Sequence, residues 1–111
     1  MVRRSRTDPV VNAARGAEVG AGSDLLERDS FDGVMDTVGG LLEAVDRLDL
    51  GIVLEMGADL VIDVDGRPHL IEVNSRPRGR MEVLATMDPG RWRAAHIRAC
   101  GRPIEVLASL A

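Results

Sequence analysis

Residues 57–77 of the chain read GADLVIDVDGRPHLIEVNSRP. In this stretch two runs of alternating apolar residues flank Asp65-Gly66. An Asp-Gly pair between such runs is the strongest short-range signal for a β-hairpin. The stretch therefore predicts two antiparallel strands, at residues 58–64 and 67–74, joined by a two-residue loop.

A two-residue loop sets the register of the two strands, whereas a longer loop would shift it. The expected pairs are Val64 with Arg67, Val61 with Leu70, Asp59 with Glu72, and Gly57 with Asn74. Asp59 and Glu72 then lie directly opposite each other, and two carboxylates so placed destabilise the pairing by roughly 0.2–1 kcal/mol. The other face carries apolar residues that can pack on a helix, namely Leu60, Ile62, Ile71 and Val73.

The acidic face of this hairpin carries the oxygen ligands of a hard cation. Mg²⁺ is usually held by one or two carboxylates plus substrate phosphates, and Asp59, Glu72 and the amide of Asn74 supply such a set. Residues 75–80 add three arginines that can meet phosphate, of which Arg76 is the nearest to Asn74. The alternative is a solvent-facing hairpin with scattered acids, followed by solvated arginines.

These residues resemble a known family. Gly-Ala-Asp at residues 57–59 and Val-Asp-Gly-Arg-Pro-His-Leu-Ile-Glu-Val-Asn-Ser-Arg-Pro at residues 64–77 are similar to the metal-binding strand pair of the ATP-grasp superfamily. That superfamily includes D-alanine–D-alanine ligase, glutathione synthetase and ribosomal-protein glutamate ligases. The amino-acid sequence of these two segments is most similar to that of the YheC/YheD-type branch of endospore-coat-associated proteins. The resemblance implies that Asp59, Glu72 and Asn74 hold the Mg²⁺ or Mn²⁺ ions that bridge the phosphates of ATP.

A second motif lies near the N-terminus, after an expected strand at residues 9–13. Residues 12–17 read NAARGA and resemble the Asn-x-x-Arg-Gly-Gly loop that lies near the ATP phosphates in the same branch. The resemblance implies that Asn12, Arg15 and Gly16 bind ATP, and that Arg15 and Arg76 act in catalysis by steadying phosphates. Ala17 departs from the second glycine of the family pattern. Taken alone, the segment reads equally well as a plain glycine-rich loop.

Helical patterns flank the hairpin. Apolar residues recur every three or four positions over an expected helix at residues 30–48, with Ser30 as its N-cap. They are Phe31, Val34, Met35, Val38, Leu41, Leu42, Val45 and Leu48. Asp88-Pro89 predicts the start of a helix at residues 89–100 that Gly101 ends, and Pro103 predicts another at 103–110. The expected class is α+β, an antiparallel hairpin packed on helices, as in the C-terminal subdomain of an ATP-grasp fold.

Charge and composition exclude several classes of protein. The net charge of −4 argues against a general nucleic-acid binder, and Phe31 and Trp92 are the only aromatic residues on which a base could stack. The single cysteine, Cys100, has no partner for an internal disulfide, which suits a reducing cytosol. No run approaches the roughly 18 apolar residues of a membrane span. We therefore expect one cytoplasmic domain at most, spore-associated if the branch is right.

The resemblance covers the chain from about residue 12 onward and corresponds to the last half of an ATP-grasp enzyme. The upstream half of that family carries lysines that reach the phosphates, and no lysine here fits that role. The chain is thus expected to be the Mg²⁺-binding half of an ATP-dependent carboxylate–amine ligase. It would need the missing half or another subunit, together with a small-molecule or peptide carboxylate as substrate. The alternatives are a non-catalytic ATP- or metal-binding module, for instance in a spore coat, and a remnant without a ligand.

Overall fold

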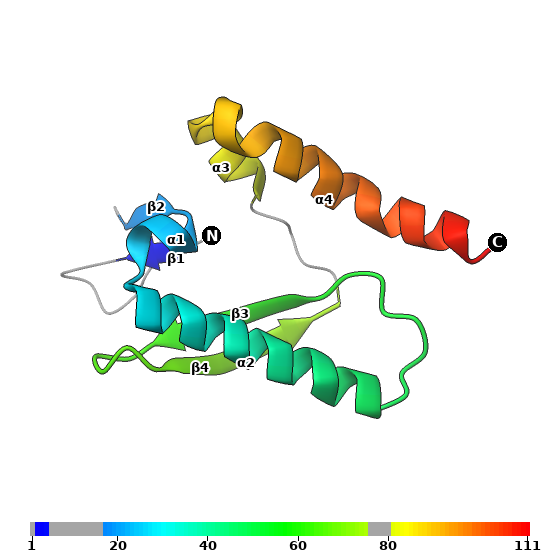
Figure 1. Ribbon diagram of the computed structural model, residues 1–111, viewed down its shortest axis with the longest axis horizontal. Coiled ribbons are helices and arrows are strands. Elements are labelled where there is room, and N and C mark those ends of the chain that lie inside the picture. The colour runs from blue at the N-terminus through cyan, green and yellow to red at the C-terminus, as the bar shows by residue number, and fades with distance from the viewer. Residues whose placement is uncertain (1, 5–16, 76–80) are drawn as a thin grey trace.

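The computed structural model describes residues 2–4, 17–75 and 81–111. Two small antiparallel sheets and four helices make an α+β protein, as the sequence predicts (Figure 1). In chain order they are β1 (Val2–Arg4), β2 (Glu18–Gly20), α1 (Gly22–Leu25), α2 (Arg28–Arg47), β3 (Gly57–Ile62), β4 (Pro68–Asn74), α3 (Met81–Met87) and α4 (Pro89–Ser109). The expected strand at residues 9–13 lies outside the described residues.

The β3–β4 hairpin and α2 form the first packed unit. α2 crosses one face of the hairpin (Figure 1). The apolar stripe predicted for this helix divides in two. Phe31, Val34, Val38, Leu41 and Val45 are half-buried, whereas Met35, Leu42 and Leu48 are exposed. A Cβ at Gly33 would lie 3.4 Å from Cδ of Pro68, so this glycine allows the helix and β4 to approach closely.

α2 begins two residues before the predicted start. Glu27 occupies the N-cap position in extended conformation, and the amide of Phe31 donates to its carbonyl at 2.9 Å. The prediction of Ser30 as N-cap was therefore wrong. The hydroxyl of Ser30 instead lies against the hairpin loop, 2.7 Å from where a Cβ at Gly66 would stand. Asp29 places a carboxylate in the first turn, where the helix dipole favours negative charge.

The hairpin loop is longer than two residues. The amide of Gly66 donates to the carbonyl of Asp63 at 3.0 Å, and the amide of Asp63 donates to the carbonyl of Arg67 at 3.0 Å. Gly66 has φ of +81°, which makes a turn followed by a left-handed glycine, the usual form of a three-residue loop. The predicted pairing of Val64 with Arg67 is therefore wrong. Val64 lies within the loop, which is closed by the hydrogen bonds of Asp63 to Gly66 and Arg67.

A register shift in the middle of the hairpin compensates for the longer loop. Near the loop Leu60 pairs with Leu70 and Val61 with His69, so the prediction of Val61 opposite Leu70 was wrong. Between Asp59 and Leu60 the register changes by one residue, which leaves Ile71 as the extra residue of β4. Ile71 is 67% exposed and Val73 is 41% exposed, so neither is buried on the helix face as predicted.

α3 and α4 form the second unit, in which the two helices pack on each other (Figure 1). α4 is one continuous helix, so the predictions of an end at Gly101 and a restart at Pro103 were wrong. The side chain of Asp88 caps α4 as predicted, because it accepts from the amide of Arg91 at 3.1 Å. The helix continues to a C-cap at Leu110, since Gly101 keeps a helical conformation instead of the left-handed one that ends a helix.

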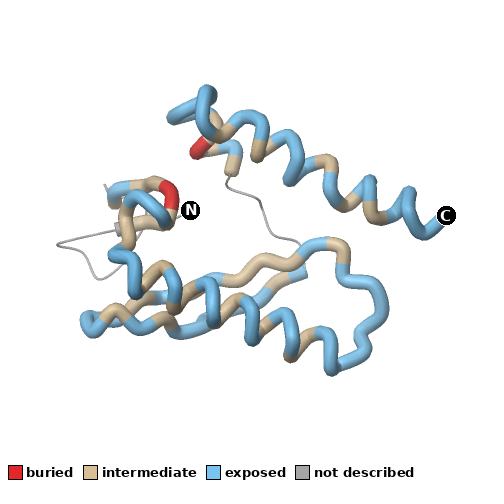
Figure 2. The backbone as a smooth tube through the Cα atoms, in the orientation of Figure 1, coloured by how far each residue is buried: buried red, intermediate tan, exposed pale blue. Residues whose placement is uncertain are grey.

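Little of the described chain is buried. Ala21 and Leu84, each 5% exposed, are the two buried residues among those described (Figure 2). Ala21 precedes α1, in the small N-terminal unit of β1, β2 and α1, and Leu84 lies in α3. Among the described residues sixteen large apolar side chains are exposed, and they extend over α2, the segment before the hairpin, the hairpin, α3 and α4. The molecule therefore consists of small units with thin cores and much apolar surface.

Candidate functional site

The acidic pair of the hairpin lies where the sequence placed it. Asp59 pairs with Glu72, and Gly57 pairs with Asn74, so both predicted pairs are confirmed. Directly opposed residues have Cβ atoms about 4.5–5.5 Å apart, which lets two carboxylates of this kind share one cation. Both side chains are exposed, while the neighbours of Asp59 along β3, Ala58 and Leu60, are half-buried. The acids therefore occupy the face of the sheet that α2 does not cover.

Asn74 ends β4 at the open end of the hairpin. Asn74 is half-buried. Its Oδ1 atom is inaccessible to solvent and accepts no hydrogen bond from the described residues. A buried amide oxygen normally has a partner, because leaving it unpaired costs about 1–3 kcal/mol. An oxygen of this kind, two positions along β4 from Glu72, is suited to accept either a cation or a donor that arrives with a ligand.

The loop end of the hairpin holds a second ionisable pair. Oδ1 of Asp63 accepts from the amides of Asp65 and Arg67, each at 2.9 Å, and Oδ2 lies 2.8 Å from Nε2 of His69. The hydrogen bond from His69, followed by those from the two amides, holds the pKa of Asp63 below its usual value of 3.8. Asp63 therefore organises the turn. His69 pairs with Val61 of β3.

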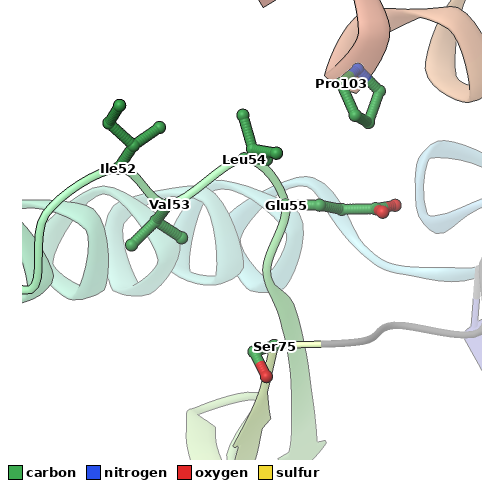
Figure 3. A pocket seen from close by; sticks show the side chains of 6 residues that line it. All are labelled: Ile52, Val53, Leu54, Glu55, Ser75 and Pro103. Carbon is green, nitrogen blue, oxygen red and sulfur yellow. The ribbon is translucent and has the colours of Figure 1, made fainter. Parts of the chain in front are cut away.

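An apolar pocket of about 380 Å³ lies beside the open end of the hairpin (Figure 3). Residues 52–55 line one side, Pro103 of α4 lies above them, and Ser75 follows Asn74 at the end of β4. Glu55 and Ser75 supply the polar groups of this lining, which also includes Ile52, Val53 and Leu54. The sequence did not predict this pocket, since Pro103 comes from a distant helix.

Several predicted site residues cannot be placed. Asn12, Arg15, Gly16 and Arg76 all lie outside the described residues. Of the predicted set, the structure therefore brings together the three proposed metal ligands and does not locate the proposed ATP and phosphate ligands. Within the described ranges there is no cluster of three or more His, Cys, Asp or Glu side chains. The candidate centre combines two carboxylates with an amide.

Three further contacts were not predicted from the sequence. Arg91 of α4 forms a bidentate ion pair with Asp24 of α1, with N–O distances of 2.7 and 2.9 Å. The guanidinium of Arg91 also lies 4.6 Å from the ring centre of Trp92. The hydrogen bond from Arg91 holds the pKa of Asp24 below its usual value, and the same bond raises the pKa of Arg91. The sulfur of Cys100 lies 3.9 Å from both ring nitrogens of His96, one helical turn away.

Comparison with protein-family models, curated proteins and solved structures finds no match to this chain. In the described part of the chain, none of the helices is both long and apolar enough to cross a membrane.

Proposed function

We propose that the chain is the Mg²⁺-binding, C-terminal half of an ATP-grasp protein of the carboxylate–amine ligase type. The observation that carries the proposal is the placement of Asp59 opposite Glu72, with Oδ1 of Asn74, which has no donor among the described residues, at the same end of the hairpin. These are the three side chains to which the resemblance to the superfamily assigns the metal. We place the protein in the cytoplasm, where ATP and Mg²⁺ are abundant.

The donor set fits a hard divalent cation. Mg²⁺ and Mn²⁺ take carboxylate and amide oxygens, and the three residues supply only such atoms. A cation also offsets the repulsion between the two opposed carboxylates and satisfies the buried amide oxygen, and both are otherwise unfavourable. When bound, the ion would neutralise charge on the phosphates of ATP, which is the main electrostatic contribution of metals to phosphoryl transfer.

The remaining roles belong to residues around this centre. Arg15 and Arg76 would steady the phosphates, and Asn12 and Gly16 would contact ATP, as the resemblance implies. A carboxylate substrate would accept the terminal phosphoryl group, and an amine would then displace phosphate from the acyl-phosphate. The lysines that the family uses would come from another segment or subunit, so we expect the chain alone to bind Mg²⁺ and ATP without turnover.

The experiment is a calorimetric titration of Mg²⁺, then of Mg²⁺ with ATP, into the purified chain and three variants. Asp59→Asn and Glu72→Gln keep the size of the side chain and remove a charged ligand, so they should abolish the heat of binding. Asp65→Asn removes a carboxylate from the other end of the same hairpin and is the matched control. It keeps the backbone amide that donates to Asp63.

Three outcomes separate the hypotheses. Heat that persists in Asp65→Asn and vanishes in the other two variants supports the metal centre. Heat from Mg²⁺ but none from ATP favours a metal-responsive module without catalysis. No heat in the wild-type chain would exclude a site built by this chain alone. Glu72→Gln has a second readout, because removing the repulsion should stabilise the metal-free hairpin by about 0.2–1 kcal/mol.

A further inference from the structure

The pocket beside the hairpin combines an apolar wall with two polar groups. The polar groups are the carboxylate of Glu55 and the hydroxyl of Ser75. The apolar wall consists of Ile52, Val53, Leu54 and Pro103. The volume of about 380 Å³ falls within the range of roughly 300–1,000 Å³ that is usual for small-molecule sites. Such sites are mostly apolar with a few polar groups that select the ligand, as in this pocket.

The apolar wall is only partly covered by the chain itself. Residues 52–56 form neither helix nor strand. Figure 3 shows Ile52 and Leu54 extending to one side of this segment and Val53 to the other. Ile52 is 66% exposed, whereas Leu54 and Pro103 are half-buried. An apolar ligand body against this wall removes exposed apolar surface from water, which favours binding.

The two polar groups have no partner among the described residues. Neither the carboxylate of Glu55 nor the hydroxyl of Ser75 forms a hydrogen bond or an ion pair there. Glu55 is also the only charged residue in the described part of the lining. A carboxylate only accepts hydrogen bonds, and a hydroxyl can accept as well. The lining therefore attracts a cationic donor and repels an anion.

We propose that the pocket binds a primary amine with an apolar body. Its ammonium would donate to the carboxylate of Glu55 and to the hydroxyl of Ser75. Its apolar body would lie against Ile52, Leu54 and Pro103. An ammonium has three N–H donors, and hydrogen bonds between charged groups are the stronger ones. The net charge of −4 also attracts a cation from a longer distance.

The position of the pocket gives this amine a role. Ser75 directly follows Asn74, and Glu55 precedes Gly57, the strand partner of Asn74, by two residues, which span at most about 7 Å. The pocket and the candidate metal centre therefore share the open end of the hairpin. We infer that the pocket holds the amine substrate of the proposed ligase. Glu55 would repel both ATP and the carboxylate substrate, so neither of these fits the pocket.

The role as substrate rests on the proposed function, whereas the binding of the amine does not. None of the three proposed metal ligands belongs to the described lining. In the reaction the ammonium first loses one proton to the carboxylate of Glu55. The nitrogen then bonds to the carbonyl carbon of the acyl-phosphate, and the bond from that carbon to the phosphate oxygen breaks. The second proton leaves with the phosphate, and an amide remains.

The test is an NMR titration of the full ¹⁵N-labelled chain without Mg²⁺ or ATP. Three ligands share one apolar body and differ in charge: 4-phenylbutylamine, 4-phenylbutan-1-ol and 4-phenylbutanoate. The amine should bind most tightly and shift the amide signals of Glu55 and Ser75. The alcohol should bind roughly fivefold more weakly, because it lacks the charge that pairs with Glu55. The carboxylate should bind more weakly than the alcohol, because Glu55 repels it.

Variants of Glu55 test the charge directly. Glu55→Gln should raise the dissociation constant of the amine roughly fivefold and leave that of the alcohol unchanged. Glu55→Lys should reverse the order, so that 4-phenylbutanoate binds better than the amine. Glu43→Gln is the matched control, because Glu43 is an exposed acid of α2 without a partner among the described residues and lies outside the described lining. Circular dichroism checks that all three variants stay folded.

Each outcome of the titration decides between binding modes. An amine whose affinity falls in Glu55→Gln and persists in Glu43→Gln supports the pocket. The absence of amine binding, or equal affinity for all three ligands, overturns it. An affinity that falls in Asp59→Asn but not in Glu55→Gln would place the ammonium at the metal centre and also overturn the pocket.

Mn²⁺ separates the role as substrate from the proposed function. If calorimetry detects Mn²⁺ at the metal centre, the bound ion should enhance the NMR relaxation of the methylene group beside the ammonium. Asp59→Asn should remove that enhancement. Binding of both Mn²⁺ and the amine without this enhancement overturns the role as substrate. Binding of the amine to a chain that takes no Mn²⁺ or Mg²⁺ contradicts the proposed function and supports the pocket as an amine site.

Discussion

The two main units of the molecule hold together in different ways. In the α2–hairpin unit, residues 28–75, glycines bring backbone and side chains close at two points, Gly33 against Pro68 and Gly66 against Ser30. The helical unit, residues 81–111, has one buried side chain, Leu84, and a long helix with exposed apolar residues. A short-range turn and two close approaches hold the α2–hairpin unit together. In the helical unit one buried side chain, Leu84, packs between the two helices. Changes should therefore affect the two units separately.

The largest effect is expected at Leu84. Replacing a buried leucine by alanine costs about 2–5 kcal/mol, because the apolar contacts are lost and a cavity remains. Leu84→Ala should therefore release α3 from α4 and expose the amides of both helices to hydrogen exchange. Met87→Ala is the control, since Met87 in the same helix is 61% exposed. If the amides of residues 28–75 lose protection from hydrogen exchange to the same degree, the two units unfold as one cooperative body. That result would contradict the view that the two units are stabilised separately.

A smaller effect, confined to the other unit, is expected at Gly66. An alanine there must adopt the left-handed conformation, which costs about 1–2 kcal/mol, and its Cβ also displaces the hydroxyl of Ser30. Gly66→Ala should lower the free energy of unfolding of the hairpin in urea by that amount.

Gly39→Ala is the matched control, because Gly39 lies inside α2 with no atom within 4 Å of the added Cβ. It should stabilise the unit by about 0.5–1 kcal/mol. If the two variants change the free energy of unfolding by equal amounts of opposite sign, the backbone conformation of the glycine determines the effect of both substitutions. Destabilisation by both variants would contradict that.

The sequence predicts the first unit better than the second, and the reason is the range of the interactions. Asp-Gly between alternating runs is a local signal, so the hairpin and the pairing of Asp59 with Glu72 were confirmed. The loop was misjudged by one residue because the carboxylate of Asp63 accepts two backbone amides, which a count of spacings does not include. The shift at Ile71 then restored the predicted pairs, so two local errors cancelled at the site.

The helical unit was harder to predict, because Gly101 and Pro103 are strong local stop signals. Gly101 was predicted to end one helix and Pro103 to begin the next, yet α4 passes through both residues. The pocket wall at Pro103 also involves residues 52–55, which are far away in sequence, and such tertiary contacts override propensity. The pocket was missed for the same reason, while Asn74 was predicted from its place at a strand end.

The smallest effect is expected at the contact between the helical unit and α1. Arg91 lies between Asp24 and the ring of Trp92, and Trp92 is the only tryptophan of the chain. Its fluorescence should therefore report the position of the guanidinium. Because Arg91 holds the pKa of Asp24 below 3.8, the ion pair contributes fully above that pH and is lost as pH falls through the lower, folded-state value.

We expect the emission of Trp92 to change in one step below about pH 4, and Asp24→Asn to show the low-pH emission at every pH. The ion pair is exposed, so salt should weaken it, and the step should shrink at 1 M NaCl. Arg93→Ala, a neighbouring arginine of α4 with no ion pair among the described residues, should leave the step in place. A step that survives in Asp24→Asn would mean that another acid holds Arg91. Asp88, which also favours the charged form of Arg91, would then be the acid that holds the guanidinium.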